Sequence, residues 1–212
     1  DLGTAGRATY LFRPGLDPSP GATSYIEEGQ RNGVDQAYKC RVRRPWWRTP
    51  VLAPPDLFLT YMNAGFPQLA ANPARLRHLN SVHGVYLRDE LATVGSQLLP
   101  LVCLNSFTLL GAEAVGRAYG GGMLKIEPKE ADLLPLPTPD VVASAAEQLL
   151  GLVAPVRVLL ASGNAREAIR LVDDVLLGQA LGLEDGAIRA LERAREHMVG
   201  RRKARGRSSK GK

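Results

Sequence analysis

Apolar and polar positions follow two different patterns along the chain, and the change falls near Pro139. From about residue 25 to residue 137, short apolar runs alternate with Pro, Gly and Asn breaks, which is typical of strands joined by irregular loops. This pattern predicts a short helix at 89–99 and strands at 37–43, 57–62, 82–87, 104–109 and 123–126, and the linker before it contains one short strand at 9–12. The strand–helix alternation of a doubly wound sheet does not occur.

After Pro139, apolar positions recur with helical spacing. We expect a helix at 141–153, a second from an Asn164 cap through Leu181 that ends at Gly182, and a third at 185–199. The fold class is therefore α+β. We predict a linker at 1–22, a mainly β domain at 23–138, a helical subdomain at 139–200 and a disordered basic tail at 201–212.

The net charge of +6 comes from the C-terminal end of the chain. Residues 201–212 hold seven basic and no acidic residues, which leaves 20 basic against 21 acidic residues before them. Such a tail either contacts a phosphate backbone without reading sequence or simply keeps the chain soluble. A nucleic-acid site in the body of the chain must therefore be a local patch.

The few cysteines and histidines exclude a closed structural zinc site. Cys40 and Cys103 are far apart, no Cys-x-x-Cys occurs and only three histidines are present. One disulfide is possible, but a reducing, cytoplasmic setting is favoured. No apolar run approaches the roughly 20 residues of a bilayer span. The chain begins at Asp1 rather than Met, without a leader, so we expect a fragment or a processed piece.

The densest cluster of cations lies at 38–48. On a strand at 37–43, Tyr38, Cys40 and Val42 would be buried and the cations would form a row on the other face. Arginine forks suit guanine edges, and indole rings either stack on bases or fill the core beneath the strand. The candidate DNA-binding residues of this segment are Lys39, Arg41, Arg43, Arg44, Trp46, Trp47 and Arg48.

Two further segments carry polar groups. Asn80 can bond an adenine edge, and His83 either contacts a phosphate or base or is a satisfied core group. Ser81 and His83 share a strand face, but no acidic residue lies close in sequence to orient the ring for nucleophilic catalysis. Gly120–Gly122 precedes a strand and lacks the Lys-Ser/Thr ending of a phosphate loop, so it predicts a turn that lets another surface approach.

Two proline loops fall short of the (Asp/Asn/Ser)-Pro-Pro-aromatic loop of amino methyltransferases, which contacts a flipped base. Ala53-Pro54-Pro55-Asp56 lacks the polar first residue and the aromatic last one. Asn72-Pro73-Ala74-Arg75 lacks the second proline and the aromatic residue. We assign no catalytic and no metal-binding residues to this chain.

An ordered set of motifs resembles the target-recognition region of TaqI-like adenine-N6 DNA methyltransferases. Its first part runs Tyr25-Ile26-Glu27-Glu28-Gly29, then Gly33 to Arg43, then Pro45-Trp46-Trp47. Leu79-Asn80-Ser81-Val82-His83-Gly84 and Leu104-Asn105-Ser106 follow in the same order. The closing part, Gly116-Arg117, Tyr119 to Pro128 and Leu133 to Pro137, is also similar to type I specificity subunits. The resemblance covers about residues 25–140.

The resemblance implies a two-part enzyme of a restriction-modification or phage-defence system. An N-terminal Rossmann-like domain would bind S-adenosylmethionine and methylate adenine N6, and the C-terminal region would select the DNA sequence. This chain shows the second part only, without the cofactor loop or the catalytic proline loop. Its expected partners are double-stranded DNA and a catalytic domain in cis or in trans. Asn80, Arg117 and Lys125 are further DNA-binding candidates carried over from the motif positions.

Other classes stay open on the sequence. A stand-alone DNA- or RNA-binding specificity subunit with a separate catalytic partner would have the same features. An RNA-binding module would prefer single strands stacked on Trp46 and Trp47. A small hydrolase that uses Ser81 and His83 lacks an evident orienting acid.

Overall fold

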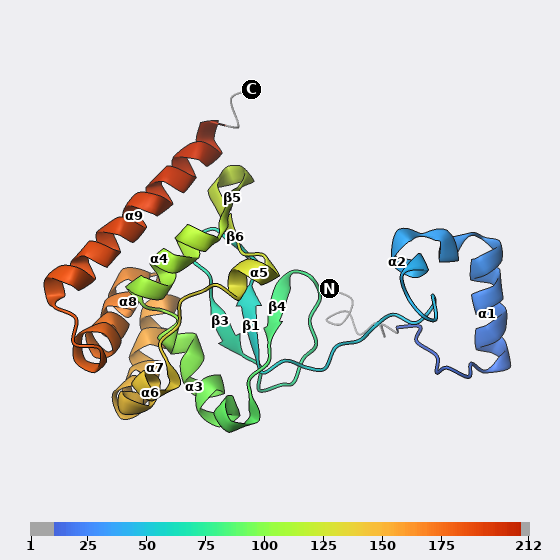
Figure 1. Ribbon diagram of the computed structural model, residues 1–212, viewed down its shortest axis with the longest axis horizontal. Helices are drawn as coiled ribbons and strands as arrows, with labels where there is room; N and C mark the ends of the chain where they lie inside the picture. The colour runs from blue at the N-terminus through green and yellow to red at the C-terminus, as the bar shows by residue number, and fades with distance from the viewer. Residues whose placement is uncertain (1–10, 209–212) are drawn as a thin grey trace. The chain divides into compact units, whose positions relative to one another are not determined.

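The computed structural model describes residues 11–208, and the chain divides into two compact units, residues 1–53 and 54–212 (Figure 1). This division differs from the predicted boundaries after residues 22 and 138. The helices that follow Pro139 share one hydrophobic core with residues 98–109, so no boundary separates them. Part of the predicted strand at 9–12 lies outside the described residues, and Leu11 and Phe12 have no regular structure.

The first unit is built from short helical segments. α1 (Pro20–Arg31) begins at Ser19, whose hydroxyl accepts from the Ala22 amide at 3.4 Å. Gly33, with φ of 72°, ends this segment in the left-handed conformation that glycine adopts without strain. η1 (Val34–Gln36) and α2 (Tyr38–Arg41) follow. Proline at the start and glycine after the end make α1 a well-delimited helix.

The predicted strand at 37–43 is wrong, because this segment is helical. The amides of Cys40 and Arg41 both donate to the Ala37 carbonyl, at 2.8 and 3.0 Å. Within the described residues, strands occur only in the second unit, so this segment has no neighbour with which to pair. Alternating side chains predict a strand only if a partner strand satisfies its backbone.

The second unit contains two small antiparallel sheets. One has the order β3–β1–β4, formed by Leu69–Ala71, Leu57–Thr60 and Val82–Val85. The other has the order β2–β6–β5, formed by Met62–Asn63, Met123–Lys125 and Arg117–Tyr119. The strands predicted at 57–62, 82–87 and 123–126 are confirmed, with a break at Tyr61 where the chain passes from one sheet to the other.

Helices make up most of the second unit. After η2 (Asp89–Leu91) come α3 (Ala92–Val102), α4 (Ser106–Val115), η3 (Gly120–Gly122) and α5 (Pro128–Ala131). The C-terminal part adds α6 (Pro139–Ser144), α7 (Ala146–Ala161), α8 (Ala165–Asp173), the π-helical η4 (Asp174–Ala180) and α9 (Asp185–Ser208). The helices predicted at 89–99, 141–153, 164–181 and 185–199 are confirmed, with extended or divided ends.

The main core lies among α3, α4, α6, α7, α8 and η4. Its fully buried side chains include Leu98, Leu149 and Leu176. The predicted strand at 104–109 is wrong, because Asn105 caps α4 by accepting from the Thr108 amide at 2.9 Å. A short apolar run buried on all sides has no period that separates strand from helix, so the capping residue is the better signal here.

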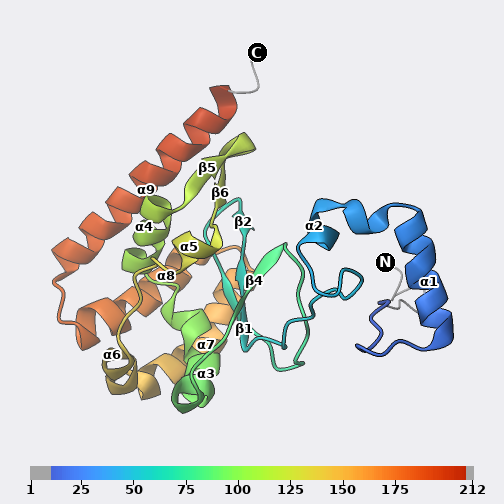
Figure 2. The ribbon, with the colours of Figure 1, turned by 45° about the vertical axis from the view of Figure 1, so that its right-hand side comes forward.

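The basic tail is not disordered over residues 201–208, which continue α9. α9 runs beside α4 and the hairpin of β5 and β6 (Figure 2). Arg202 is 2% exposed, so the last turns of α9 are packed against the second unit. The glycine turn at η3 contacts this helix, since an ideal Cβ at Gly206 would lie 2.1 Å from the Gly122 amide nitrogen. The predicted close approach at Gly120–Gly122 is confirmed.

The fold class is α+β, as predicted, with 56% of the described residues in helices and 10% in strands. The strand content is smaller than a mainly β domain would have, because two of the predicted strands are helical. Within residues 11–208, no single helix is long and apolar enough to cross a membrane. Only the bent pair Asp89–Val102 and Ser106–Val115 meets that test jointly, by length and composition alone.

Candidate nucleic-acid interface

Most of the predicted DNA-binding residues fall into two groups, one in each unit, and Asn80 and His83 lie outside both groups. In the first unit, α2 and the turn after it replace the predicted strand, so Lys39, Arg41 and Arg43 do not form a single row. The expected buried face is also absent, since Tyr38 is 67% and Val42 is 62% exposed. Lys39 and Arg41 are exposed as well. The segment therefore presents cations and apolar side chains together.

Arg44 holds the turn that follows α2. Its Nη1 donates to the carbonyls of Arg41 at 2.8 Å and of Arg43 at 3.0 Å. The Arg44–Pro45 peptide bond that follows is cis. A cation that bonds the last carbonyls of a helix also opposes the negative end of the helix dipole. Arg44 thus has a structural task that the sequence pattern did not indicate.

Trp46 packs against α1. An ideal Cβ at Gly29 would lie 3.0 Å from the Trp46 ring, so the absence of a side chain at Gly29 makes room for the indole. The Trp46 and Trp47 rings meet edge to face, with centroids 6.1 Å apart and an interplanar angle of 88°. Trp46 therefore fits the packing alternative better than base stacking.

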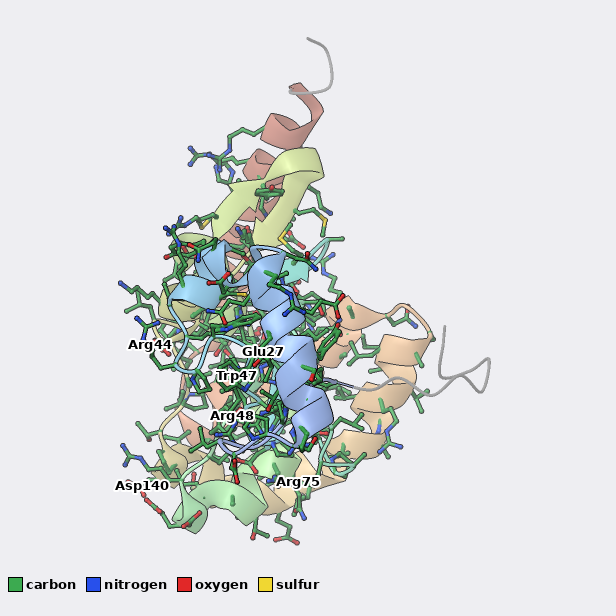
Figure 3. All side chains as sticks on the ribbon, turned by 90° about the vertical axis from the view of Figure 1, so that its right-hand side faces the viewer. Glu27, Arg44, Trp47, Arg48, Arg75 and Asp140 are labelled. Atoms are coloured by element: carbon green, nitrogen blue, oxygen red, sulfur yellow. The ribbon has the colours of Figure 1, made fainter. Side chains whose placement is uncertain are left out.

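Two hydrogen-bond donors of the first unit are buried without a partner among the described residues. They are Nε1 of Trp47 and Nε of Arg48. Both side chains, together with Arg44, come from the segment after α2 (Figure 3). A buried donor without an acceptor is costly, so these two donors lower the stability of the segment.

The second group lies on the outer face of the β2–β6–β5 sheet. Arg117 pairs directly with Lys125, and Tyr119 pairs with Met123, so these side chains share one face. Ala118 and Leu124 point to the other face, and Leu124 is 1% exposed. The pleat of the hairpin therefore separates an apolar face, with Leu124 buried and Ala118 exposed, from an outer face that carries two cations and an exposed tyrosine.

Lys125 lies among two aromatic rings and a carboxylate. Its Nζ is 2.6 Å from Oε1 of Glu127, 5.1 Å from the Tyr61 ring centroid and 5.4 Å from the Tyr119 ring centroid. The Tyr61 hydroxyl donates to the same Glu127 oxygen at 3.1 Å. Cations close to aromatic faces are attracted by the ring quadrupole. This arrangement fixes Lys125 over the outer face of the sheet.

Arg117 is held by a carboxylate that also caps a helix. Its Nε donates to Oε1 of Glu130, and Oε2 of Glu130 accepts from the Glu127 amide at 2.8 Å in the capping box of α5. The Arg117 side chain is 69% exposed, and this bond uses one of its five N–H donors. Its terminal nitrogens can therefore reach a ligand while Glu130 fixes the stem.

The ion pair shifts both partners in the direction that favours their charged forms. The hydrogen bond from Lys125, with a smaller effect of Tyr61, lowers the pKa of Glu127. The hydrogen bond to Glu127 raises the pKa of Lys125. Both groups stay charged through the neutral range. The Lys125–Glu127 pair therefore gives the outer face two charges that do not change near pH 7.

His83 connects the two sheets. Its Nε2 is 2.7 Å from the Ile126 carbonyl, and its ring meets the Tyr61 ring edge to face at 5.1 Å. No hydrogen bond joins Ser81 to His83 within the described residues. The arrangement matches the alternative of a satisfied core polar group, and it gives no support to a Ser–His nucleophile.

Asn80 is exposed in the turn before β4. The loop that carries it is braced at its start by Asn72. Nδ2 of Asn72 donates to the carbonyls of Pro55 and Leu76, both at 2.8 Å, and its Oδ1 accepts from the Leu76 amide at 2.9 Å. This loop is a presented surface separate from the hairpin.

The sequence patterns missed four members of the second group, which are Tyr61, Tyr119, Glu127 and Glu130. Strand alternation could have found Tyr119, because it lies two residues from Arg117. Glu127 and Glu130 form a capping box, whose spacing is readable in sequence. Tyr61 is 64 positions before Lys125, and no local signal links the two.

Other chemistry is limited in the described part of the chain. Within residues 11–208, no group of three or more His, Cys, Asp or Glu side chains could hold a metal ion. Cys40 and Cys103 are free thiols, and burial raises the pKa of Cys103 to about 12. Asp56, at the end of the first proline loop, is bound to Arg75 at 3.0 Å and to the Leu87 amide at 2.8 Å. That carboxylate braces a loop and is not available for catalysis.

The comparisons with known proteins agree on one enzyme class. Residues 1–177 match the family model described as the C-terminal domain of the type II methyltransferase M.Eco57I. The chain belongs to this family. This match independently supports the resemblance to the C-terminal region of a methyltransferase that the sequence motifs indicated.

Two curated relatives are type II methyltransferases. M.XamI of Xanthomonas campestris pv. amaranthicola is 36% identical over 116 residues, which are 55% of this chain and 21% of the relative. M.AccI of Acinetobacter calcoaceticus is 22% identical over 181 residues, which are 83% of this chain and 33% of the relative. The chain thus spans between a fifth and a third of the length of these relatives. No solved structure gives a significant match.

Proposed function

We propose that this chain recognises a specific sequence of duplex DNA for an adenine-N6 DNA methyltransferase of a restriction-modification or phage-defence system. The methyl transfer itself would belong to a catalytic domain, in cis or in trans. Membership of a methyltransferase C-terminal family supports this division of labour. We further propose a cytoplasmic setting, in which the two thiols stay reduced.

The observation that carries the proposal is the outer face of the β5–β6 hairpin. Arg117 and Lys125 lie directly opposite each other, with Tyr61 and Tyr119 beside the ammonium group. Cations fixed beside aromatic rings suit a ligand that offers phosphate oxygens and flat bases. A carboxylate binds each cation, Glu130 at Nε of Arg117 and Glu127 at the ammonium of Lys125, so each position is set before the ligand arrives.

The segment after α2 in the first unit supplies the second contact in this proposal. Lys39, Arg41 and Arg43 provide cations that suit acceptors on base edges or phosphates. Arg44 also holds the turn, because its Nη1 bonds two backbone carbonyls there, and its other donors can contact DNA. Base contacts would select the sequence, while phosphate contacts would fix the register.

S-adenosylmethionine does not fit the described residues. The glycine turn Gly120–Gly122 contacts α9, so its backbone does not form an open cradle. The proline loop at 54–55 is followed by Asp56, whose carboxylate bonds Arg75 and Leu87. We propose that the cofactor binds to the catalytic domain, and that binding of DNA by this chain lets that domain extrude the adenine into its own pocket.

An alternative is a stand-alone DNA- or RNA-binding specificity subunit with a separate catalytic partner. The exposed Tyr38 and Tyr119 rings would favour single strands if RNA were the ligand. Duplex and single-stranded pools of the same length separate the two ligands. Co-purification of a methyltransferase from the native host tests for a partner in trans.

The test is selection from a randomised duplex pool with the full chain at physiological salt. We expect one enriched motif, and the two tryptophans, both in the first unit, should change fluorescence on binding to it. Truncation at residue 200 is unsuitable, because it removes the buried Arg202. Enrichment only from the single-stranded pool would overturn the duplex assignment.

Point variants then test the two groups. Arg117→Ala should weaken binding to the enriched duplex by about tenfold or more, the range of a lost arginine–base contact. Arg41→Ala with Arg43→Ala should do the same. Arg31→Ala, which removes an exposed cation from α1, is the control and should have little effect. Equal losses on enriched and random duplexes would remove base readout from the proposal.

A further inference from the structure

The loop between β3 and β4, residues 72–81, is held in place at its start. The buried side chain of Asn72 forms three hydrogen bonds, two of them to the backbone of Leu76. Asp56 accepts from Nη1 of Arg75 at 3.0 Å. Arg75 has a φ of 50°, a left-handed conformation that is costly for a residue with a side chain and persists only where the surrounding contacts enforce it.

The same loop is held a second time at His78. Its ring meets the Phe58 ring of β1 edge to face, with centroids 5.9 Å apart. An ideal Cβ at Gly84 of β4 would lie 2.5 Å from Cε1 of His78, so the glycine makes room for the imidazole. Phe58 and Gly84 are directly paired in the sheet, which places the imidazole on the face that they share. The position of the residue after His78 is therefore set by the sheet.

That residue, Leu79, is 81% exposed, the largest value of any large apolar side chain in the described part of the chain. Leu76, between the two points of attachment, is 60% exposed. Scattered exposed leucines are ordinary on protein surfaces. Here both belong to one loop that several side chains fix, so the loop presents apolar groups at a set position instead of folding over them.

The charge of the loop favours nucleic acid as the partner. Residues 72–81 contain two arginines and no acidic residue. The side chain of Arg75 is 59% exposed and uses one of its five N–H donors on Asp56, so other donors can reach a phosphate. Asn80, exposed beside Leu79, offers a donor and an acceptor to a base edge. Stacked bases between phosphates match this combination of apolar, amide and cationic groups.

We propose that Leu79 inserts between two base pairs of bound duplex DNA, and that Arg75 contacts a phosphate beside the opened step. This inference rests on the proposed function, because it takes duplex DNA as the ligand. An apolar side chain inserted in this way unstacks one base step and kinks the duplex by roughly 20–90°. An opened step also lowers the cost of extruding a neighbouring adenine, because part of its stacking is already lost.

The test compares the full chain with Leu79→Ala on a short duplex that carries the enriched motif and a dye at each end. Energy transfer between the dyes measures the bend, and 2-aminopurine, which fluoresces more strongly when unstacked, replaces the purines of the motif in turn. We expect the unsubstituted chain to bend the duplex and to raise the 2-aminopurine signal at one step. Leu79→Ala should bind the duplex with both effects lost.

Two further variants show whether the lost bend comes from the inserted side chain. Leu79→Met keeps an apolar side chain of similar volume, so it should keep the bend. Leu150→Ala, which shortens an exposed leucine of α7, is the matched control and should bend the duplex as the unsubstituted chain does. An unchanged bend in Leu79→Ala would overturn the proposal. If that variant instead weakened association with a co-purified methyltransferase, Leu79 would contact a protein and not DNA.

The outcomes separate this inference from the proposed function. If selection enriches a motif but the bound duplex stays straight, the insertion is wrong and sequence recognition stands. If selection enriches no motif, but the unsubstituted chain bends a random duplex and Leu79→Ala does not, sequence recognition is wrong and the insertion stands.

Discussion

Arg202 of α9 forms a buried bidentate ion pair with Glu113 of α4, 89 residues earlier in the chain. The side chains are 2% and 4% exposed. The guanidinium also donates to the carbonyls of Gly65, at 3.1 Å, and of Gly122. A charged group taken from water is tolerated only when its donors are satisfied, and these four bonds meet that demand. The pair therefore joins α9, α4 and the η3 turn.

Removing one partner of this pair should destabilise the second unit strongly. Arg202→Met leaves Glu113 as an uncompensated buried carboxylate, so we expect a loss of about 3–5 kcal/mol in the free energy of unfolding. Urea denaturation followed by far-UV circular dichroism measures it. Arg193→Met, on the opposite face of α9, should change the free energy by less than about 0.5 kcal/mol. Similar effects of the two variants would show that the pair does not anchor α9.

Two glycines of α9 should respond oppositely to alanine. At Gly206, an ideal Cβ would lie 2.1 Å from the Gly122 amide nitrogen, so Gly206→Ala must push the helix away from the η3 turn. At Gly200, an ideal Cβ would meet nothing within 4 Å. Gly200→Ala should therefore stabilise the helix by roughly 0.5–1 kcal/mol, while Gly206→Ala destabilises the unit.

Thermal unfolding of Gly200→Ala, Gly206→Ala and the unsubstituted chain measures these changes in stability. Amide hydrogen exchange then shows which part of α9 is destabilised. Faster exchange confined to the last turns of α9 in Gly206→Ala is expected. Equal protection there in both alanine variants would contradict the contact between α9 and the glycine turn.

The strands that the sequence could predict are those with an alternating pattern and a partner. At 57–60, burial alternates residue by residue, because one face packs inward and the other does not. At 37–43 the alternation is just as regular, but the first unit offers no strand for pairing in its described part. The local pattern gives the tendency of a segment to form a strand. Whether the strand forms depends on a pairing partner elsewhere in the chain.

Long-range pairing also explains which contacts of the candidate site could not be predicted from the sequence. Arg117 and Lys125 were candidates from motif positions, and their meeting across the hairpin follows from the short turn between them. The contact of Tyr61 with Lys125 depends on the pairing of β2 with β6, which no local signal reveals. Arg202 resembled the other cations of a solvated tail, and only its distant partner makes it a buried residue.

Asp173 should make the stability of the second unit depend on pH. This residue is 3% exposed and accepts from the amide and hydroxyl of Ser106, at 2.7 and 2.6 Å. Burial raises its pKa despite these bonds. Because the folded state holds the proton more tightly than the unfolded chain, this group lowers stability as pH rises from the unfolded value of about 3.8 through the folded pKa.

The variant that tests this is Asp173→Asn, which keeps an acceptor for the Ser106 amide and removes the buried charge. We expect it to be more stable than the unsubstituted chain at pH 7, with an advantage that shrinks as pH falls toward 4. Urea midpoints across that range measure the difference. Asp132→Asn, which removes the charge of an exposed carboxylate, serves as the control. An advantage independent of pH would mean that the charge of Asp173 is not its cause.

Replacement of Arg43 and of Arg44 by glutamine should affect different properties of the protein, although the two residues are adjacent. Arg44 donates to the carbonyls of Arg41 and Arg43. Arg44→Gln should therefore destabilise the turn after α2 by about 1–3 kcal/mol, the range of a lost hydrogen bond from a charged donor. Arg43→Gln should leave that turn intact and lower the affinity for duplex DNA.

Tryptophan emission separates these two effects, because Trp46 and Trp47 are the two tryptophans of the chain and both lie in the first unit. Arg44→Gln should shift the urea midpoint that this emission reports and leave the circular-dichroism transition of the second unit unchanged. Arg43→Gln should leave both transitions in place and weaken binding to the enriched duplex. If Arg44→Gln weakened DNA binding with no shift in the tryptophan midpoint, Arg44 would contact the ligand and its role in the turn would be secondary.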